Sequence, residues 1–454
     1  MNLQDFPRPA NGSRRGIHWS ATVFHPFGSS LDWWVSELCA MNIRWVKLLD
    51  DGGGSSRHLC QSLLTHQIIP IVRLYRDRPN PGHLGDREKN TVADLVAVGV
   101  RYFEVNNEPN LPEEWLPGEW QSGGRPEVVM QHWLEDARAV IKLGGYPAFP
   151  ALTQCGHHAE HGSIPWYTQA FRWLGEHARS EALDVFGNGA WLAVHDVVLN
   201  HCYRDEKGEW HFEYPYDPIC QADQPGKTIM DDDNSLIGHQ APLKLLQDNL
   251  GVQVPVISTE GGVFAPRGGW EQLDSRYPGY NLDGHAERTV AMFRWLQSNA
   301  EDCYFAMCPW LIANERMGHI DPQWSEQAWY QLDRDLTVVA SLKALPAEPV
   351  PPPPLPLDEA LRNAAWNRRG IAYNPEASFP RYARQYRLGS PVTPEFDVTW
   401  KNKTYRVQAV SYTHLRAHDT VLDLVFRLLL EKQQQLVIDS HTQKHLTNNT
   451  PYNY

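Results

Sequence analysis

A strand-sized run ends in a cluster of polar residues at Arg101–Asn110, which reads RYFEVNNEPN. Its first half, Arg101–Asn106, has the length and the aromatic content of a β-strand. A second run, Pro255–Thr259, reads PVIST and leads directly into Glu260. Glu108 and Glu260 are therefore each expected at the carboxyl end of a strand. The number of such runs in the chain then decides the fold class.

Runs of this kind alternate with amphipathic, helix-like stretches from about residue 16 to residue 345. Eight runs are strand-sized, namely Gly16–Ser20, Ile43–Leu49, Ile68–Leu74, Arg101–Asn106, Tyr146–Leu152, Trp191–Val198, Pro255–Thr259 and Cys303–Trp310. The helix-like stretches include Ser30–Met41, Ser56–His66, Glu127–Leu143, Ser235–Leu250, Ala286–Ser298 and a closing helix at Glu326–Leu345. Eight strand–helix alternations predict an α/β fold, a (β/α)8 barrel over residues 1–345. The alternative, a doubly wound open sheet, favours a glycine-rich fingerprint after the first strand, and GIHWSATVFHPFG has none.

The composition and charge of the chain argue against several classes of function. The 454 residues carry a formal net charge of −13, which argues against a nucleic-acid partner because such binding depends on clustered Lys and Arg. No stretch approaches the ~18 apolar residues of a membrane span, so no membrane partner is expected. The seven cysteines form no CxxC pair, which disfavours a disulfide framework and a thiolate zinc site. The first residues, MNLQDFPRPANGSRRG, lack the apolar core of a secretory signal.

The composition changes abruptly after residue 345. Residues 346–357 read PAEPVPPPPLPL and predict an extended, semi-rigid linker. Residues 358–410 are expected to form a small accessory module, which ends within a strand. From about Val410, the text VSYTHLRAHDTVLDLVFRLLLEKQ resembles a translated sequencing-adapter peptide, which implies that residues 411–454 are a non-native tail and that the module is incomplete. The alternative is a genuine amphipathic C-terminal helix followed by a polar tail.

Two glutamates at strand ends point to a chemistry. Active sites of (β/α)8 barrels lie at the carboxyl ends of the strands, where Glu108 and Glu260 are expected. A carboxylate there is costly to desolvate unless it is paired or used. Cleavage of a glycosidic bond needs two such groups, one protonated to donate to the leaving oxygen and one ionised to attack or stabilise the sugar cation.

Asn107-Glu108-Pro109 together with Glu260 resembles the signature of glycoside hydrolase clan A, whose members are retaining enzymes on a TIM barrel. The resemblance implies that Glu108 is the general acid/base, that Glu260 is the nucleophile, and that Asn107 hydrogen-bonds the sugar 2-hydroxyl. It further implies an oligo- or polysaccharide substrate, a β-linkage, no metal or organic cofactor, and carboxyl groups ~5–5.5 Å apart.

Four more residues are candidates for substrate contact. The resemblance implies that His195, in Ala193-Val194-His195-Asp196, orients the carboxylates and that Trp310 forms the floor beneath the reacting sugar. His195 also fits a core histidine, and Trp310 fits plain core packing. Arg73 is compatible with charge-pairing a carboxylate on the rim, and Tyr203 lies in a long insertion, Asn200–Asp233, that is expected to shape the subsites.

Other motifs in the sequence suggest alternative functions. His157–His161 reads HHAEH and matches an inverted zinc-peptidase motif, but Gly156 and Gly162 leave room for one helical turn at most. A glycine-rich turn such as Asp51–Ser56 can bind a phosphate, but no Gly-Lys-Ser/Thr follows it, so a flexible loop with Ser56 at a helix cap is expected. Asp231–Asp233 is expected to start a helix. A non-catalytic barrel that binds carbohydrate or cell wall through its appended module is the alternative function from another class.

Overall fold

The chain folds into two compact units, Met1–Val350 and Pro351–Tyr454, in this computed structural model. The structure describes residues 1–76, 80, 82–120, 124–154, 162–198, 202–213, 217–266, 281–318, 321–348, 381, 396–400, 403–412, 423–429 and 435–438.

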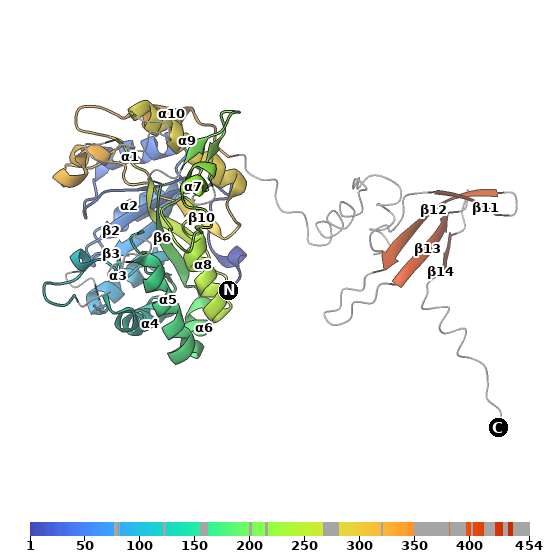
Figure 1. Ribbon diagram of the computed structural model, residues 1–454, viewed down its shortest axis with the longest axis horizontal. Coiled ribbons are helices and arrows are strands. Elements are labelled where there is room, and N and C mark those ends of the chain that lie inside the picture. Colours follow the sequence, from blue (N-terminus) through green and yellow to red (C-terminus); the bar gives the residue numbers. More distant parts are fainter. Residues whose placement is uncertain are drawn as a thin grey trace, which may run out of the picture. The chain divides into compact units, whose positions relative to one another are not determined.

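The first unit is built around eight parallel strands (Figure 1). In sheet order they are β1 (Gly16–His18), β2 (Trp45–Asp50), β3 (Ile69–Leu74), β4 (Tyr102–Glu104), β5 (Tyr146–Phe149), β6 (Trp191–Val198), β9 (Val256–Val263) and β10 (Tyr304–Met307). A parallel bridge between Arg15 and Met307 joins the two ends of the sheet. The predicted (β/α)8 barrel is confirmed as a nearly closed barrel of eight parallel strands surrounded by helices.

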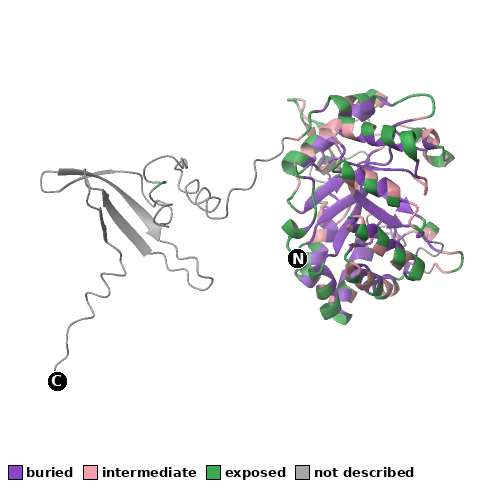
Figure 2. Ribbon diagram, turned by 180° about the vertical axis from the view of Figure 1, so that it is seen from behind, coloured by how far each residue is buried: buried purple, intermediate pink, exposed green. Residues whose placement is uncertain are grey.

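Helices cover the outside of the strands, which are almost entirely buried (Figure 2). They are α1 (Gly28–Ala40), α2 (Arg57–Thr65), α3 (Asp86–Ala97), α4 (Pro126–Lys142), α5 (Ser163–His177), α6 (Arg179–Gly187), α7 (Pro218–Asp223), α8 (Gln240–Leu250), α9 (Leu282–Asn299) and α10 (Thr337–Ala344). A small hairpin, β7 (Tyr203–Arg204) and β8 (Trp210–His211), lies in the insertion after β6. None of these described helices has both the length and the apolar character needed to cross a bilayer.

Two sequence-based expectations about helix starts are wrong. The closing helix begins at Thr337 rather than Glu326, because the backbone N–H groups of Trp329 and Tyr330 donate to carbonyls of the segment after β10 instead of continuing a helix. Asp231–Asp233 does not start a helix either. The Asp231 carboxylate accepts hydrogen bonds from the Thr228 N–H and hydroxyl, and α8 begins only at Gln240.

Large aromatic side chains fill the barrel interior near the amino-terminal ends of the strands. Trp45, Tyr102 and Trp191 are fully buried and belong to one cluster, in which Phe6 packs its ring against Tyr146 at 5.1 Å. The polar atoms of the large rings are satisfied by backbone carbonyls, for example Trp191 Nε1 by Tyr146 O at 2.9 Å. Part of the tryptophan content therefore serves packing below the site and not ligand contact.

A register shift in β9 places two consecutive side chains inside the barrel. Val194 pairs with Ser258 but the next residue of β6, His195, pairs with Glu260, so Thr259 is an extra residue in the ladder. Strand side chains normally alternate between the two faces, and a bulge of this kind re-aims one of them. The Thr259 hydroxyl consequently donates to Glu104 Oε1 at 2.7 Å, while Glu260 also reaches the interior.

The second unit contains one antiparallel sheet in the order β11 (Phe396–Trp400), β12 (Lys403–Tyr412), β13 (Asp423–Leu429) and β14 (Gln435–Ile438). β12 runs through residue 410, where the sequence suggested a boundary, and pairs with β13 as far as Tyr412 opposite Asp423. The reading of this stretch as an amphipathic C-terminal helix is wrong, because its described residues are strands.

Trp191→Ala tests the packing of the barrel interior. Truncating this fully buried ring should lower the free energy of unfolding by about 3–5 kcal/mol, measured by urea denaturation. Trp33→Ala is the matched control, because Trp33 is 39% exposed on α1, and it should cost about 1 kcal/mol or less. Equal losses in the two variants would contradict the interior cluster as a main source of stability.

Candidate active site

Glu108 lies just past the end of β4 in an unusual backbone conformation. Its φ is +37°, in the left-handed region that residues other than glycine seldom adopt. The Glu108 N–H donates to Ala151 O at 2.9 Å, which ties this turn to the segment after β5. Strained non-glycine residues of this kind cluster at functional sites, where the surrounding structure holds them.

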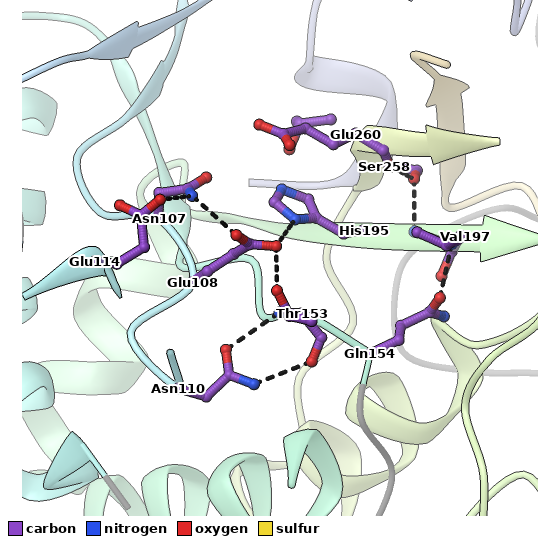
Figure 3. A network of polar contacts seen from close by, with 12 residues as sticks. Asn107, Glu108, Asn110, Glu114, Thr153, Gln154, His195, Val197, Ser258 and Glu260 are labelled. Carbon is purple, nitrogen blue, oxygen red and sulfur yellow. Dashed lines mark hydrogen bonds and ion pairs between the residues drawn. The ribbon is translucent and has the colours of Figure 1, made fainter. Parts of the chain in front are cut away.

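The two carboxylate oxygens of Glu108 have different surroundings (Figure 3). Oε1 accepts from the Thr153 hydroxyl and lies 2.9 Å from His195 Nδ1. Oε2 has a single longer contact of 3.4 Å with Asn107 Nδ2. Among the described residues, Oε2 is therefore the oxygen with room for a further hydrogen-bond partner.

Glu260 faces the opposite side of His195 and is surrounded by cations. Lys47 Nζ, on β2, donates to Glu260 Oε1 at 2.6 Å, and Arg73 Nη1, on β3, lies 3.9 Å from the same oxygen. Burial opposes ionisation, but Lys47 and then His195 and His18 outweigh it and hold the pKa of Glu260 well below its usual range. Glu260 is thus a carboxylate at neutral pH, and its side chain is 17% exposed.

Two histidines next to these carboxylates differ in charge. Burial and the neighbouring Lys47 lower the pKa of His18 to about 3, so this ring is neutral where its Nε2 approaches Glu260 Oε1 at 3.5 Å. Burial also disfavours the charged form of His195, but Glu260 and Glu108 raise its pKa above the ordinary value. Of the two histidines, His195 is therefore the one whose protonated form the neighbouring carboxylates favour.

Trp310 follows β10 and contacts both His18 and the residue after Glu260. Its backbone N–H donates to Gly261 O at 3.1 Å, and its ring packs on His18 with centroids 4.3 Å apart. Trp324 packs edge-on against the Trp310 ring, with centroids 5.1 Å apart. Trp310 is 9% exposed, and its Nε1 has no hydrogen-bond partner among the described residues. The ring is thus largely buried, and it packs on His18, which itself approaches Glu260.

Arg73 and Asn107 connect the two glutamates through a third one. Arg73 Nη2 donates to Glu114 Oε2 at 3.2 Å, and Asn107 Nδ2 donates to Glu114 Oε1 at 2.9 Å. The side chains therefore form a continuous chain of contacts from Glu260 through Arg73, Glu114 and Asn107 to Glu108. Of the candidates named from the sequence, the structure brings Glu108, Glu260, Asn107, His195, Arg73 and Trp310 together.

Tyr203 is not joined to this group by any contact of the described residues. It lies on β7, half-buried, with its ring stacked on His211 of β8 at a centroid distance of 4.7 Å. A role for Tyr203 in shaping subsites stays a prediction.

The HHAEH motif and the glycine-rich loop after β2 form no competing site within the described residues. His157–His161 lies outside the described residues, and within those residues no group of three or more His, Cys, Asp or Glu could hold a metal ion. The glycine-rich loop after β2 does not offer its N–H groups to a phosphate, because those of Gly52, Gly54 and Ser56 donate to the Asp50 carboxylate. Ser56 precedes α2 as expected, but its hydroxyl also donates to Asp50 instead of capping the helix.

Sequence reasoning missed Lys47, His18, Thr153 and Glu114. A signal existed for two of them, because Lys47 and His18 are polar residues inside strand-sized apolar runs. Such groups are costly to bury unless they are paired or used, as was argued for Glu108 and Glu260. Thr153 and Glu114 lie in loops after β5 and β4, where no periodicity marks a residue as facing the site.

No family model and no curated protein matches this sequence. Solved structures that resemble it include the GH39 enzyme from Xanthomonas axonopodis pv. citri, at 12% identity and a TM-score of 0.45, covering 76% of this chain and 68% of that one. A monomeric beta-xylosidase from Caulobacter crescentus CB15 shows 12% identity and a TM-score of 0.44, with 94% of this chain and 76% of that one covered. The GH53 catalytic domain of Ignisphaera aggregans shows 12% identity and a TM-score of 0.42, with coverages of 77% and 99%.

The chain is similar to barrels of glycoside hydrolases. At 12% identity the likeness concerns the fold alone, which the strand order establishes independently. Any activity of this chain has to be argued from its own side chains.

Lys47→Met tests the electrostatics of Glu260. Removing the ammonium group should raise the pKa of Glu260 by about 1–3 units, because an opposite charge within hydrogen-bonding distance is lost. Carbodiimide labels the protonated carboxyl, so the pH at which half of Glu260 is labelled, read by peptide mass spectrometry, should move upward. Lys244→Met, on the exposed face of α8, is the control and should leave this midpoint in place. An unmoved midpoint in Lys47→Met would contradict Lys47 as the main cause.

Proposed function

We propose that the barrel is a retaining glycoside hydrolase that cleaves β-linked O-glycosidic bonds by double displacement. The observation that carries the proposal is the pair Glu108 and Glu260, which follow or end barrel strands and flank His195 in unlike surroundings. Lys47, with His195 and His18, keeps Glu260 ionised, as a nucleophile must be. Glu108 has one oxygen held by two donors and another with room for a leaving group, as an acid/base must have.

The first half-reaction transfers the sugar to the protein. A Glu260 carboxylate oxygen forms a bond to the anomeric carbon, the bond from that carbon to the leaving oxygen breaks, and Glu108 donates its proton to the leaving oxygen. Thr153 and His195 hold Oε1 of Glu108, so that Oε2 is the oxygen that delivers the proton. The second half-reaction reverses these roles, because the Glu108 carboxylate takes a proton from water while the water oxygen displaces Glu260 from the anomeric carbon.

Other side chains of the site suit a sugar. Asn107 Oδ1 is buried without a hydrogen-bond partner among the described residues, so it can accept from the 2-hydroxyl. The Trp310 ring, which packs on His18, offers an apolar face for the ring of the reacting sugar. Tyr75 follows β3, is 50% exposed, and lies with its ring centroid 6.0 Å from Arg73 Cζ, which suits a platform on the rim for the neighbouring unit.

Substitution of the two glutamates tests the proposal. On a panel of 4-nitrophenyl β-glycosides, Glu260→Ala should lower turnover of the best substrate by roughly 10⁴-fold or more, because the nucleophile is lost. Azide should restore part of that rate and give the α-glycosyl azide. Glu108→Ala with azide should instead give the β-glycosyl azide, because the nucleophile remains.

The control is Glu113→Gln, an exposed neighbouring glutamate, which should retain wild-type turnover. Full activity in Glu260→Ala, or azide products of the same anomeric form in the two alanine variants, would contradict the assigned roles. A wild-type protein that binds glycans but hydrolyses none would favour the non-catalytic carbohydrate-binding barrel.

A further inference from the structure

Glu114 is a third carboxylate of the site, and neither half-reaction assigns it a task. It ends the short 3₁₀ turn Pro112–Glu114 after β4, and its side chain is 23% exposed. Each of its oxygens has its own donor. Oε2 accepts from Arg73 at 3.2 Å, and Oε1 accepts from Asn107 at 2.9 Å.

Each donor to Glu114 also approaches one of the two catalytic glutamates. The other nitrogen of the Arg73 fork, Nη1, lies 3.9 Å from Glu260 Oε1, and Asn107 Nδ2 lies 3.4 Å from Glu108 Oε2. Both distances are longer than those to Glu114, so Glu114 is the stronger partner of both donors. Figure 3 shows Asn107 between the Glu114 and Glu108 carboxylates.

The charges around Glu114 come from three strands or the loops that follow them. Arg73 faces it from β3, Asn107 and Glu108 from the loop after β4, and Glu260 from β9. Burial raises the pKa of Glu114, Arg73 lowers it, and Glu108 and Glu260 raise it again, with a net upward shift. Coulomb interactions are mutual, so the negative charge of Glu114 acts in turn on the carboxyl groups of Glu108 and Glu260.

We propose that Glu114 is a positioning residue that shares Arg73 with the nucleophile and Asn107 with the acid/base, and that its negative charge sets the pH range in which both glutamates hold their working protonation states. This inference rests on the proposed function. Its physical basis is that the first half-reaction removes the negative charge from Glu260 and creates one on Glu108. Glu114 keeps Arg73 paired after Glu260 has become an ester, so the guanidinium stays in place for the second half-reaction.

Glu114→Gln tests this role through the pH dependence of kcat/KM on the aryl glycoside that the wild type hydrolyses fastest. Removing one negative charge should lower the pKa of both catalytic glutamates. The acidic and the alkaline limbs of the profile should therefore both move to lower pH, by about one unit. A purely structural role would lower the rate without moving the limbs.

Two matched variants complete the experiment. Glu114→Asp keeps the charge, so its limbs should stay at the wild-type positions even if the shorter side chain lowers kcat. Glu113→Gln removes an exposed glutamate one residue away and should leave the whole profile unchanged.

The outcomes separate the two proposals. Limbs that stay in place in Glu114→Gln, a shift of only one limb, or the same shift in Glu114→Asp would overturn the role of Glu114 while the proposed function stands. A wild-type protein that hydrolyses no glycoside would overturn the proposed function and this inference with it. The thermal unfolding midpoint of each variant shows whether a lost rate reflects lost folding.

Discussion

The contact between Lys47 and Glu260 is the interaction on which the arrangement of the site depends. Lys47 is fully buried inside the barrel, where an unpaired ammonium group would be strongly destabilising. It is compensated by Glu260 at 2.6 Å and by Glu104 at 3.6 Å. The same pairing keeps Glu260 ionised and fixes where its carboxylate can lie. Stability and reactivity are therefore coupled here, because the carboxylate that neutralises the buried Lys47 is also the nucleophile of the proposed reaction.

The bulge at Thr259 makes this contact possible. Without the extra residue, regular alternation would turn either Thr259 or Glu260 away from the barrel interior. With it, the Thr259 hydroxyl satisfies Glu104 and Glu260 still meets Lys47. The Ser258 hydroxyl bridges the two strands at the shift, because it accepts from the Asp196 N–H at 3.0 Å and donates to Glu260 O at 2.8 Å. A local irregularity of one strand thus sets the position of the candidate nucleophile.

Sequence patterns predicted the barrel because its strands are short, apolar and evenly interrupted by amphipathic helices. They also pointed to Glu108 and Glu260, since a carboxylate after an apolar run is conspicuous. Lys47 carried a comparable signal, as a charge within such a run, and was overlooked. Glu114 and Thr153 could not be found in this way, because loops have no periodicity and their side chains reach the site only through the tertiary fold. The start of the last helix was misplaced for a related reason, since the pairing of Trp329 and Tyr330 with the segment after β10 is a long-range contact.

Trapping the covalent intermediate tests the central claim most directly. A 2-deoxy-2-fluoroglycoside with an activated leaving group slows both half-reactions but lets the first proceed, so the sugar stays on the nucleophile. We expect the intact protein to gain the mass of one fluoroglycosyl group and the labelled peptide to carry it on Glu260. An enzyme that turns over the parent glycoside but is labelled on another residue, or not at all, would contradict Glu260 as the nucleophile of a retaining mechanism.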